Sequence, residues 1–435
     1  MKKATFLAAT SLALTLLFSD AAQAQDELPS RVEVGIQFSS ITFPGQSPQA
    51  IQPSFARSST EAGLGGRITF NLNRNIALEA EQNYFPHGNF NDPARGGTLW
   101  QGNFGLKVGK RFGKFGIFGK ARPGFARFSR VQEVVDHVTT TDFNGNPIIV
   151  PVIGERRKTY FAMDLGGVLE FYPSRKVLTR IDVGDTIIHY GDSLFPFGVG
   201  LLEQSRTTHT LQVSAGIGFR FGSLPPEEPA TQTNNQKPKR FEVGAQFSSL
   251  GLQQVEHSLF SPIVQIPTFH NTITQAGFGG RFTFNLTPNF ALEAQGDFYP
   301  TDNAAFINNG RAGGRILQLQ AGVKAGKRFE KFGIFGKARP GVVSFSRAVE
   351  IGSVDPVFGF PTFREARKTY FSLDVGGVLE FYPSKRIVTR FDGGDTMIFY
   401  RRFDIPIFFF PVQAFTVPAE TIHNFQFSAG VGFRF

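Results

Sequence analysis

Charged side chains at alternating positions are the residues of this sequence that could do chemistry. They occur in both halves of the chain, in segments where polar or charged residues alternate with apolar ones. In the first half the acids are Glu33, Glu79, Glu81, Asp164, Glu170 and Asp182, and the bases are Arg67, Lys107, Arg111, Lys120, Arg122, Arg180 and Arg220. The second half repeats them as Glu242, Glu293, Asp374, Glu380 and Asp392 with Arg281, Lys324, Arg328, Lys337, Arg339, Arg390 and Arg434. Only Glu81 changes type, becoming Gln295.

Two kinds of chemistry fit such a set. The groups could form a charged pathway for ions, or they could fill an enclosed interior in which opposite charges pair to offset their desolvation. The near-equal numbers of acids and bases favour pairing. We expect Glu170 and Arg180 to be one such pair.

Catalytic and metal chemistry find little support. The chain has no cysteine, which excludes a disulfide framework, a thiolate zinc site, a cysteine nucleophile and a lipidated N-terminal cysteine. The seven histidines lack metal-ligand spacing, although His209 and His423 occupy matching positions in the two halves. Ser214 and Ser428 have no nearby base in the sequence. We therefore expect no catalytic residue, metal or cofactor, and keep a lipid-modifying enzyme as an alternative.

The elements that position these charges are predicted to be strands. Within 206–221, an apolar face that includes Leu211, Val213 and Phe219 opposes a polar face that includes Gln212 and Arg220, which is a period of two. Eight such segments are predicted in the first half: 31–40, 63–73, 75–85, 98–112, 114–130, 156–172, 177–190 and 206–221. Short turns alternate with long loops at 41–62, 86–97, 131–155 and 191–205, as in an outer-membrane barrel.

A membrane barrel explains these strands better than a soluble β-sandwich. Many segments exceed the five or six residues common in soluble strands. Aromatic residues gather at their ends (Tyr84 and Phe85, Phe171 and Tyr172), as an interfacial girdle requires. A sandwich core would not tolerate the charges of the opposite face.

The 435-residue chain contains an internal duplication of one unit. Residues 114–124 recur letter for letter as 331–341, and each copy ends on Gly-Phe-Arg-Phe. Residues 1–24 are predicted to be a cleaved signal peptide, with a positive start, an apolar run at Ala4–Phe18 and a small-residue cleavage pattern at Ala22-Gln-Ala24. We predict barrels at 25–221 and 240–435, joined by a proline-rich periplasmic linker at 222–239. One 16-stranded barrel is the alternative fold.

Two features of the sequence resemble a known family of proteins. The terminal aromatic residues Phe221, Phe433 and Phe435 resemble the sorting signal of Gram-negative outer-membrane barrels, and the eight-strand meander with Leu169-Glu-Phe-Tyr-Pro-Ser174 resembles the OmpA-like small barrels. The resemblance implies an outer-membrane location reached through the barrel-assembly machinery.

The function expected from these features is a non-enzymatic outer-membrane protein with plugged lumens and loops for envelope structure, surface contact or adhesion. Porin-like passage of ions or small solutes remains the alternative. The formal charge of +10 favours outer-membrane lipid and lipopolysaccharide as partners, with Arg156-Arg-Lys158 and Arg401-Arg402 as candidate contacts. The loops could also bind a surface partner, and nucleic-acid binding has no support beyond the basic pI.

Overall fold

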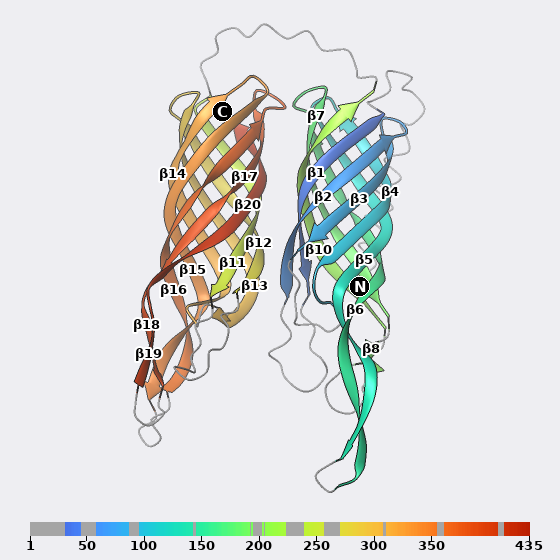
Figure 1. Cartoon of the computed structure of the whole chain (residues 1–435). Helices are drawn as coiled ribbons and strands as arrows, with labels where there is room; N and C mark the ends of the chain where they lie inside the picture. Colours follow the sequence, from blue (N-terminus) through green and yellow to red (C-terminus); the bar gives the residue numbers. More distant parts are fainter. Residues whose placement is uncertain are drawn as a thin grey trace, which may run out of the picture.

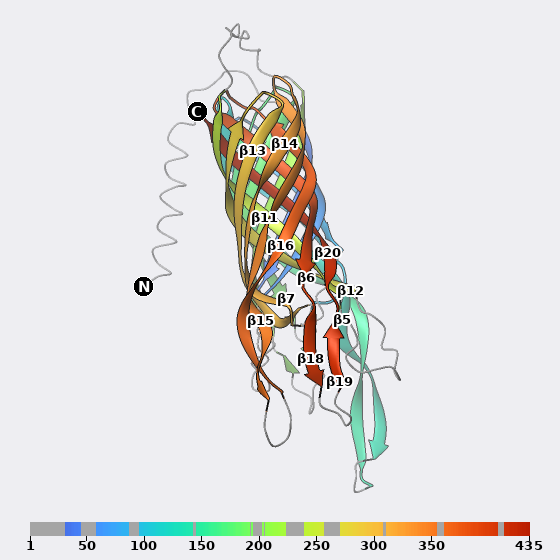
Figure 2. The same cartoon turned by 90° about the vertical axis from the view of Figure 1, so that its left-hand side faces the viewer.

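The chain folds into two β-barrels that stand side by side (Figures 1 and 2). The computed structural model describes residues 31–44, 58–86, 95–141, 145–191, 193–194, 202–203, 205–222, 239–255, 270–307, 310–354, 361–407 and 413–435. The predicted signal peptide and all but the two end residues of the predicted linker lie outside these ranges. The described residues form no helix long and apolar enough to cross a membrane.

Each barrel has eight long antiparallel strands. The strands of the first barrel are β1 (Val32–Phe43), β2 (Ser59–Asn71), β3 (Ile76–Phe85), β4 (Leu99–Phe112), β5 (Phe115–Thr141), β6 (Pro147–Phe171), β7 (Val177–Tyr190) and β10 (Arg206–Phe221). Those of the second are β11 (Phe241–Val255), β12 (His270–Asn285), β13 (Phe290–Ile307), β14 (Ala312–Arg328), β15 (Phe332–Val354), β16 (Pro361–Phe381), β17 (Ile387–Tyr400) and β20 (Glu420–Arg434). Two short hairpins complete the list: β8 (Ser193–Leu194) with β9 (Leu202–Glu203), and β18 (Phe403–Ile407) with β19 (Gln413–Val417).

Both barrels close on themselves. In the first, β1 pairs with β2 on one side and with β10 on the other, where Ser39 lies opposite Ser214. In the second, β11 pairs with β12 and with β20, where Ser248 lies opposite Ser428. The prediction of two tandem eight-stranded barrels is therefore confirmed.

The ends of each barrel differ in their connections. Turns at 72–75, 113–114 and 172–176, and at 286–289, 329–331 and 382–386, close what we name the turn end. Gly113 occupies the left-handed region (φ +37°) in the shortest of these turns, where a side chain would be strained. The long connections gather at the opposite, loop end. This asymmetry is that of outer-membrane barrels, whose short turns face the periplasm.

Strand limits near the turn end match the sequence prediction, whereas one connection at the loop end does not. The stretch 131–155, predicted to be a loop, instead continues β5 and β6 as a two-stranded hairpin far beyond the barrel (Figures 1 and 2). Its composition explains the difference, because valine, isoleucine and threonine fill both arms and favour extended backbone.

The two faces of the strands separate as the alternation predicts. Large apolar side chains such as Leu64, Ile68, Phe104 and Ile117 are exposed on the outer wall, while charged side chains are buried inside. Tyr84 and Trp100 meet on the wall with ring centroids 4.9 Å apart. The prediction that Phe85 and Tyr172 belong to the same aromatic girdle is wrong. Both face inward and are buried, since neighbours in a strand point to opposite faces, and the Tyr172 hydroxyl donates to Glu170.

The barrels touch through two pairs of equivalent positions of the two copies. The hydroxyl oxygens of Thr179 and Thr389 lie 3.0 Å apart, and Thr60 pairs with Thr274 along the backbone. These two contacts, in which a residue meets its own counterpart, have the character of a two-fold interface. The rings of Phe38 and Phe427, which are not counterparts, also stack, with centroids 4.2 Å apart.

Candidate functional site

The interior of the first barrel is organised around Glu79 of β3. Its carboxylate accepts hydrogen bonds from both terminal nitrogens of Arg180 on β7, one of them at 3.0 Å. Nη1 of Arg122 on β5 lies 3.3 Å away and Nζ of Lys107 on β4 lies 3.4 Å away. Three cations from three strands therefore converge on one buried acid.

The other acids of this layer bind the remaining donor groups of these cations. Arg122 donates to Glu81 at 2.7 Å and to Asp164 through Nε at 3.0 Å. Lys120 lies 2.9 Å from Asp164, and Arg180 Nε donates to Asp182 at 2.5 Å. The charges are thus distributed over a network and do not form isolated pairs.

A second group of contacts closes the network toward the turn end. Lys107 donates to Glu170 at 2.5 Å, and the Tyr172 hydroxyl donates to the same carboxylate at 2.8 Å. Arg180 lies 3.6 Å from Glu170, so the predicted pair exists but is the longer contact of each partner. Glu33 lies 3.5 Å from Arg220, whose guanidinium also stacks on the Tyr172 ring at 4.8 Å.

Two predicted bases occupy less central positions. Arg67 donates to the side-chain oxygen of Gln37 at 3.1 Å. Arg111 lies at the turn end, where it donates to Asn71 and to the Tyr172 hydroxyl, and its contact with Glu33 is 3.6 Å.

The second barrel repeats the layer. Arg390 binds Glu293 and Asp392, and Arg339 binds Asp374 through Nε at 2.9 Å. The remaining predicted residues pair as Lys324 with Glu380, Lys337 with Asp374, Arg281 with Glu242, Arg434 with Glu242 and Glu380, and Arg328 with Glu380 at 3.8 Å.

One acid has moved between the copies. Glu81 and Asn83 of β3 correspond to Gln295 and Asp297 of β13, so the carboxylate lies one inward position nearer the loop end in the second barrel. Asp297 is buried and accepts from Gln246 at 2.8 Å. The exchange is visible in the sequence when Glu81-Gln-Asn83 is aligned with Gln295-Gly-Asp297. It is missed when each position is compared separately.

An uncharged polar layer lies beyond the charges. In the first barrel, Gln101 donates to Gln212 at 2.9 Å, Thr186 donates to Gln212 at 2.7 Å, and Gln37 donates to Asn83 at 2.9 Å. None of these residues was predicted to belong to the site, although the alternation of the strands places all of them on the inward face.

An apolar cap fills the loop end of each lumen. In the first barrel it comprises Ile41, Phe43, Phe85, Leu99, Ala126, Phe128, Val131, Tyr160, Ala162, Ile188 and Tyr190, each at most 5% exposed. In the second it comprises Leu250, Leu252, Tyr299, Ala312, Ile316, Val343, Phe345, Tyr370, Ile398, Tyr400 and Ile422. Charges, amides and apolar side chains thus occupy successive levels of one interior.

A histidine–aspartate pair lies on the outer wall of each barrel. Nδ1 of His209 is 2.6 Å from Asp185, and Nδ1 of His423 is 2.5 Å from Asp395. Asp185 also accepts a hydrogen bond from the backbone N–H of Thr210 at 3.0 Å, so its carboxylate takes the place of a backbone carbonyl as the acceptor between the two strands. The hydrogen bonds of the described residues give the His209 ring no hydroxyl partner, and this part of the chain holds no group of three potential metal ligands. The His209–Asp185 contact therefore links β7 and β10 on the outer wall.

The terminal aromatic residues predicted to form the sorting signal lie on the outer wall at the turn end. Phe221, Phe433 and Phe435 are all about half exposed.

The first copy matches a known family. Residues 10–224 fit the family described as outer membrane protein beta-barrel domain. No curated protein matches the chain.

Solved structures give weak likenesses. Neisserial surface protein A is 10% identical over 44% of this chain and 98% of its own, with a TM-score of 0.28. The attachment invasion locus protein Ail of Yersinia pestis, in complex with the heparin analogue sucrose octasulfate, is 11% identical over 46% and 100%, with a TM-score of 0.26. A Pseudomonas aeruginosa FadL homologue is 10% identical over 92% and 89%, with a TM-score of 0.24.

Proposed function

On the premise that the first copy matches the outer-membrane β-barrel family and the second copy repeats its fold, we propose that the two barrels are closed, non-enzymatic anchors that carry contact surfaces at the cell surface. The filled lumen is the observation that supports this proposal. A water-filled path would have to cross the charge network around Glu79 and then the apolar cap around Phe128. Small eight-stranded barrels have room for little more than their own side chains.

Conductance tests the closed lumen. The full-length protein, reconstituted into planar lipid bilayers, is expected to give no steady channel, because paired charges and the cap leave no continuous aqueous column. A porin reconstituted in the same way serves as the positive control. Stable single-channel steps on the nanosiemens scale would contradict the proposal and favour porin-like passage.

The contact surface is proposed to be the hairpin formed by the distal parts of β5 and β6. Beyond the pair Val131 and Arg156, its arms carry exposed apolar side chains, among them Val138, Ile149 and Ile153. Such a ribbon exposes apolar surface and free strand edges to the medium, both of which favour association with a partner. The second barrel has no ribbon of this length among its described residues.

Cells that display the protein should adhere to a hydrocarbon phase through this ribbon. Replacing residues 133–154 with an Asn-Gly turn is expected to lower retention on hexadecane by about twofold or more, because the exposed apolar arms are lost. A second variant, Ile149→Thr with Ile153→Thr, keeps the strands of the ribbon and removes only apolar surface, so it separates the loss of apolar surface from the loss of the ribbon itself. Both variants should lose retention, and unchanged retention in either one counts against an apolar contact.

A further inference from the structure

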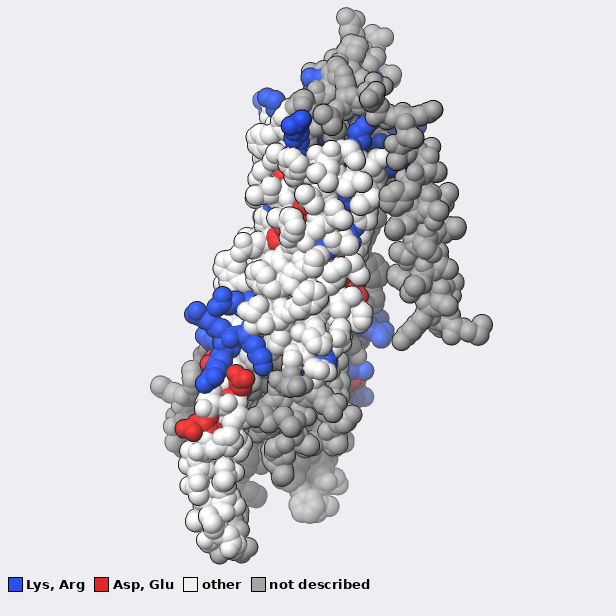
Figure 3. Space-filling view, turned by 90° about the vertical axis from the view of Figure 1, so that its right-hand side faces the viewer, with Lys and Arg blue, Asp and Glu red and all other residues white. Residues whose placement is uncertain are grey.

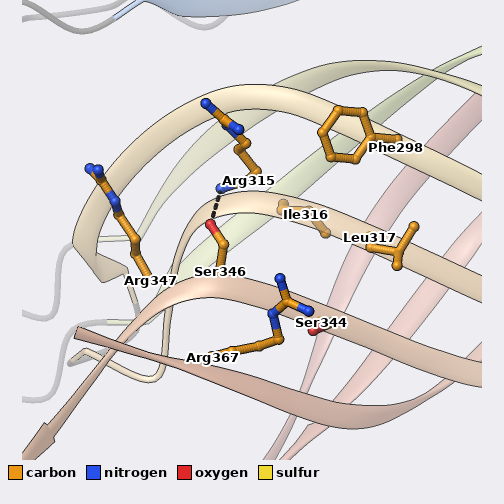
Figure 4. Close-up of a pocket in the computed structure, with 8 residues that line it drawn as sticks. All are labelled: Phe298, Arg315, Ile316, Leu317, Ser344, Ser346, Arg347 and Arg367. Atoms are coloured by element: carbon orange, nitrogen blue, oxygen red, sulfur yellow. Dashed lines mark hydrogen bonds between the residues drawn. The ribbon is translucent and has the colours of Figure 1, made fainter.

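A cavity of about 420 Å³ opens on the outer wall of the second barrel, at its loop end (Figure 4). Three arginines line it from three neighbouring strands: Arg315 of β14, Arg347 of β15 and Arg367 of β16. The hydroxyls of Ser344 and Ser346 lie between them, and the Ser346 oxygen accepts the backbone N–H of Arg315 at 2.8 Å. The cavity therefore offers guanidinium and hydroxyl groups to one ligand.

The cavity carries an excess of positive charge. Arg347 pairs with Glu365 at 3.3 Å, and the ion pairs of the described residues do not involve Arg315 or Arg367. The neighbouring Lys368 does not line the cavity and donates instead to the Val349 carbonyl at 2.8 Å. The cationic groups of the cavity are thus the three arginines.

The side of the cavity nearer the turn end is apolar. Phe298 and Leu317 line it there (Figure 4), and the exposed side chains of Leu319, Val342 and Phe371 continue the wall toward the turn end. A ligand that fills the cavity would meet cations at one end and a membrane-facing hydrocarbon surface at the other.

The first barrel also carries three arginines at the corresponding place, although one of them stands at a different position. Arg130 and Arg157 correspond to Arg347 and Arg367, whereas Thr98 replaces Arg315 and Arg127 replaces Ser344, so three arginines remain. Figure 3 shows lysines and arginines gathered on this barrel between the apolar wall and the projecting hairpin. Beside them Tyr84 and Trp100 take the places of Phe298 and Leu317.

We propose that this arginine cavity, and its counterpart on the first barrel, bind the phosphorylated head group of an outer-leaflet glycolipid whose acyl chains lie along the apolar wall. Arginine forks match phosphate oxygens in pairs, and the charge-assisted bonds are strong where the wall excludes water. Diphosphoryl lipid A has this combination of phosphates on a sugar and acyl chains. The inference rests on the proposed placement of the barrels in the outer membrane.

The test measures binding of diphosphoryl lipid A to the full-length protein in detergent by native mass spectrometry. The parent chain is expected to bind two lipid A molecules, and Arg127→Ala with Arg157→Ala should leave one. In that background, Arg315→Ala with Arg367→Ala is expected to weaken the remaining site by about tenfold or more.

The matched control is Lys385→Ala with Arg386→Ala in the same background, because both residues are exposed in the 382–386 turn. It removes equal charge from the opposite, turn-end rim of the same barrel and should change affinity by less than about twofold. Arg367→Lys keeps the charge and should still weaken binding, because a lysine cannot form the paired contact. All variants must first show the heat-modifiable gel mobility of a folded barrel.

Three results would overturn the proposal. Equal weakening by the cavity and control pairs would show general attraction by rim charge. Equal binding of dephosphorylated lipid A would remove the phosphate from recognition. Complete competition by inorganic phosphate at millimolar concentration would make the free anion the ligand. A conducting lumen in the bilayer experiment would overturn the closed anchor and leave this site untouched, so the two proposals fail separately.

Discussion

Replacing Glu79 with glutamine is expected to destabilise the first barrel by about 3–5 kcal/mol, because a buried ionic network loses one of its charges. The Glu79 carboxylate lies within 3.4 Å of a nitrogen atom of each of Arg180, Arg122 and Lys107. An amide can accept hydrogen bonds from these groups but cannot compensate three positive charges away from water. Trp100, the sole tryptophan of the chain, lies on β4 and reports unfolding of this barrel alone when its fluorescence is followed in urea.

The second barrel supplies the control for this prediction. Glu81→Gln together with Asn83→Asp copies Gln295 and Asp297, so it moves an acid within the layer without removing one. We expect this double variant to unfold close to the parent midpoint, with an unchanged denaturant slope. If Glu79→Gln unfolds no earlier than the double variant, the charges are screened by water and the lumen is not the dry, paired interior described above.

The strands could be predicted from the sequence because both of their faces are constrained. A lipid-facing wall and a filled interior leave each residue only one acceptable side, so a slip of one residue would place a charge such as Arg122 in lipid. The predicted segments 177–190 and 206–221 coincide with β7 and β10 for this reason. The constraint ends where the wall ends, and there the prediction missed the hairpin that continues β5 and β6.

The partners within the lumen could not be predicted from parity. Parity gives the side on which a residue lies, but the tilt and stagger of a barrel decide which residues meet across it. Glu170 and Arg180 face each other on adjacent strands, and the pairing between them is real. The shorter contacts run across the interior instead, from Lys107 of β4 to Glu170 of β6 and from Arg180 of β7 to Glu79 of β3.

The apolar cap was missed for a different reason. A simple alternation predicts polar side chains inside the barrel and apolar side chains outside it along the whole strand, and this places Phe85 on the wall with Tyr84. Extending the parity of Glu79 and Glu81 by two more steps reaches Phe85 and places it inside. The interior changes from charged to apolar along one strand, which an averaged pattern conceals.

Truncating Phe128 to alanine is expected to cost the first barrel about 3–5 kcal/mol, since the removed ring leaves a cavity in a closely packed cap. The Phe128 ring contacts those of Phe43, Tyr160 and Tyr190, with centroids 6.0–6.3 Å apart, and its own exposure is 3%. Urea unfolding followed by Trp100 fluorescence measures the loss, and bilayer recordings of the same variant show whether the cap or the charges close the lumen.

The second barrel again provides the comparison. Leu252 occupies the position of Phe43 there, whereas Phe345 keeps the ring of Phe128. Phe43→Leu should therefore cost less than about 1.5 kcal/mol, as hydrophobic exchanges of similar volume do. Because the charge network lies beneath the cap, Phe128→Ala should still give no steady current. Steps of current in this variant would assign closure to the apolar cap alone, and equal stability of the two variants would mean that the cap is loosely packed.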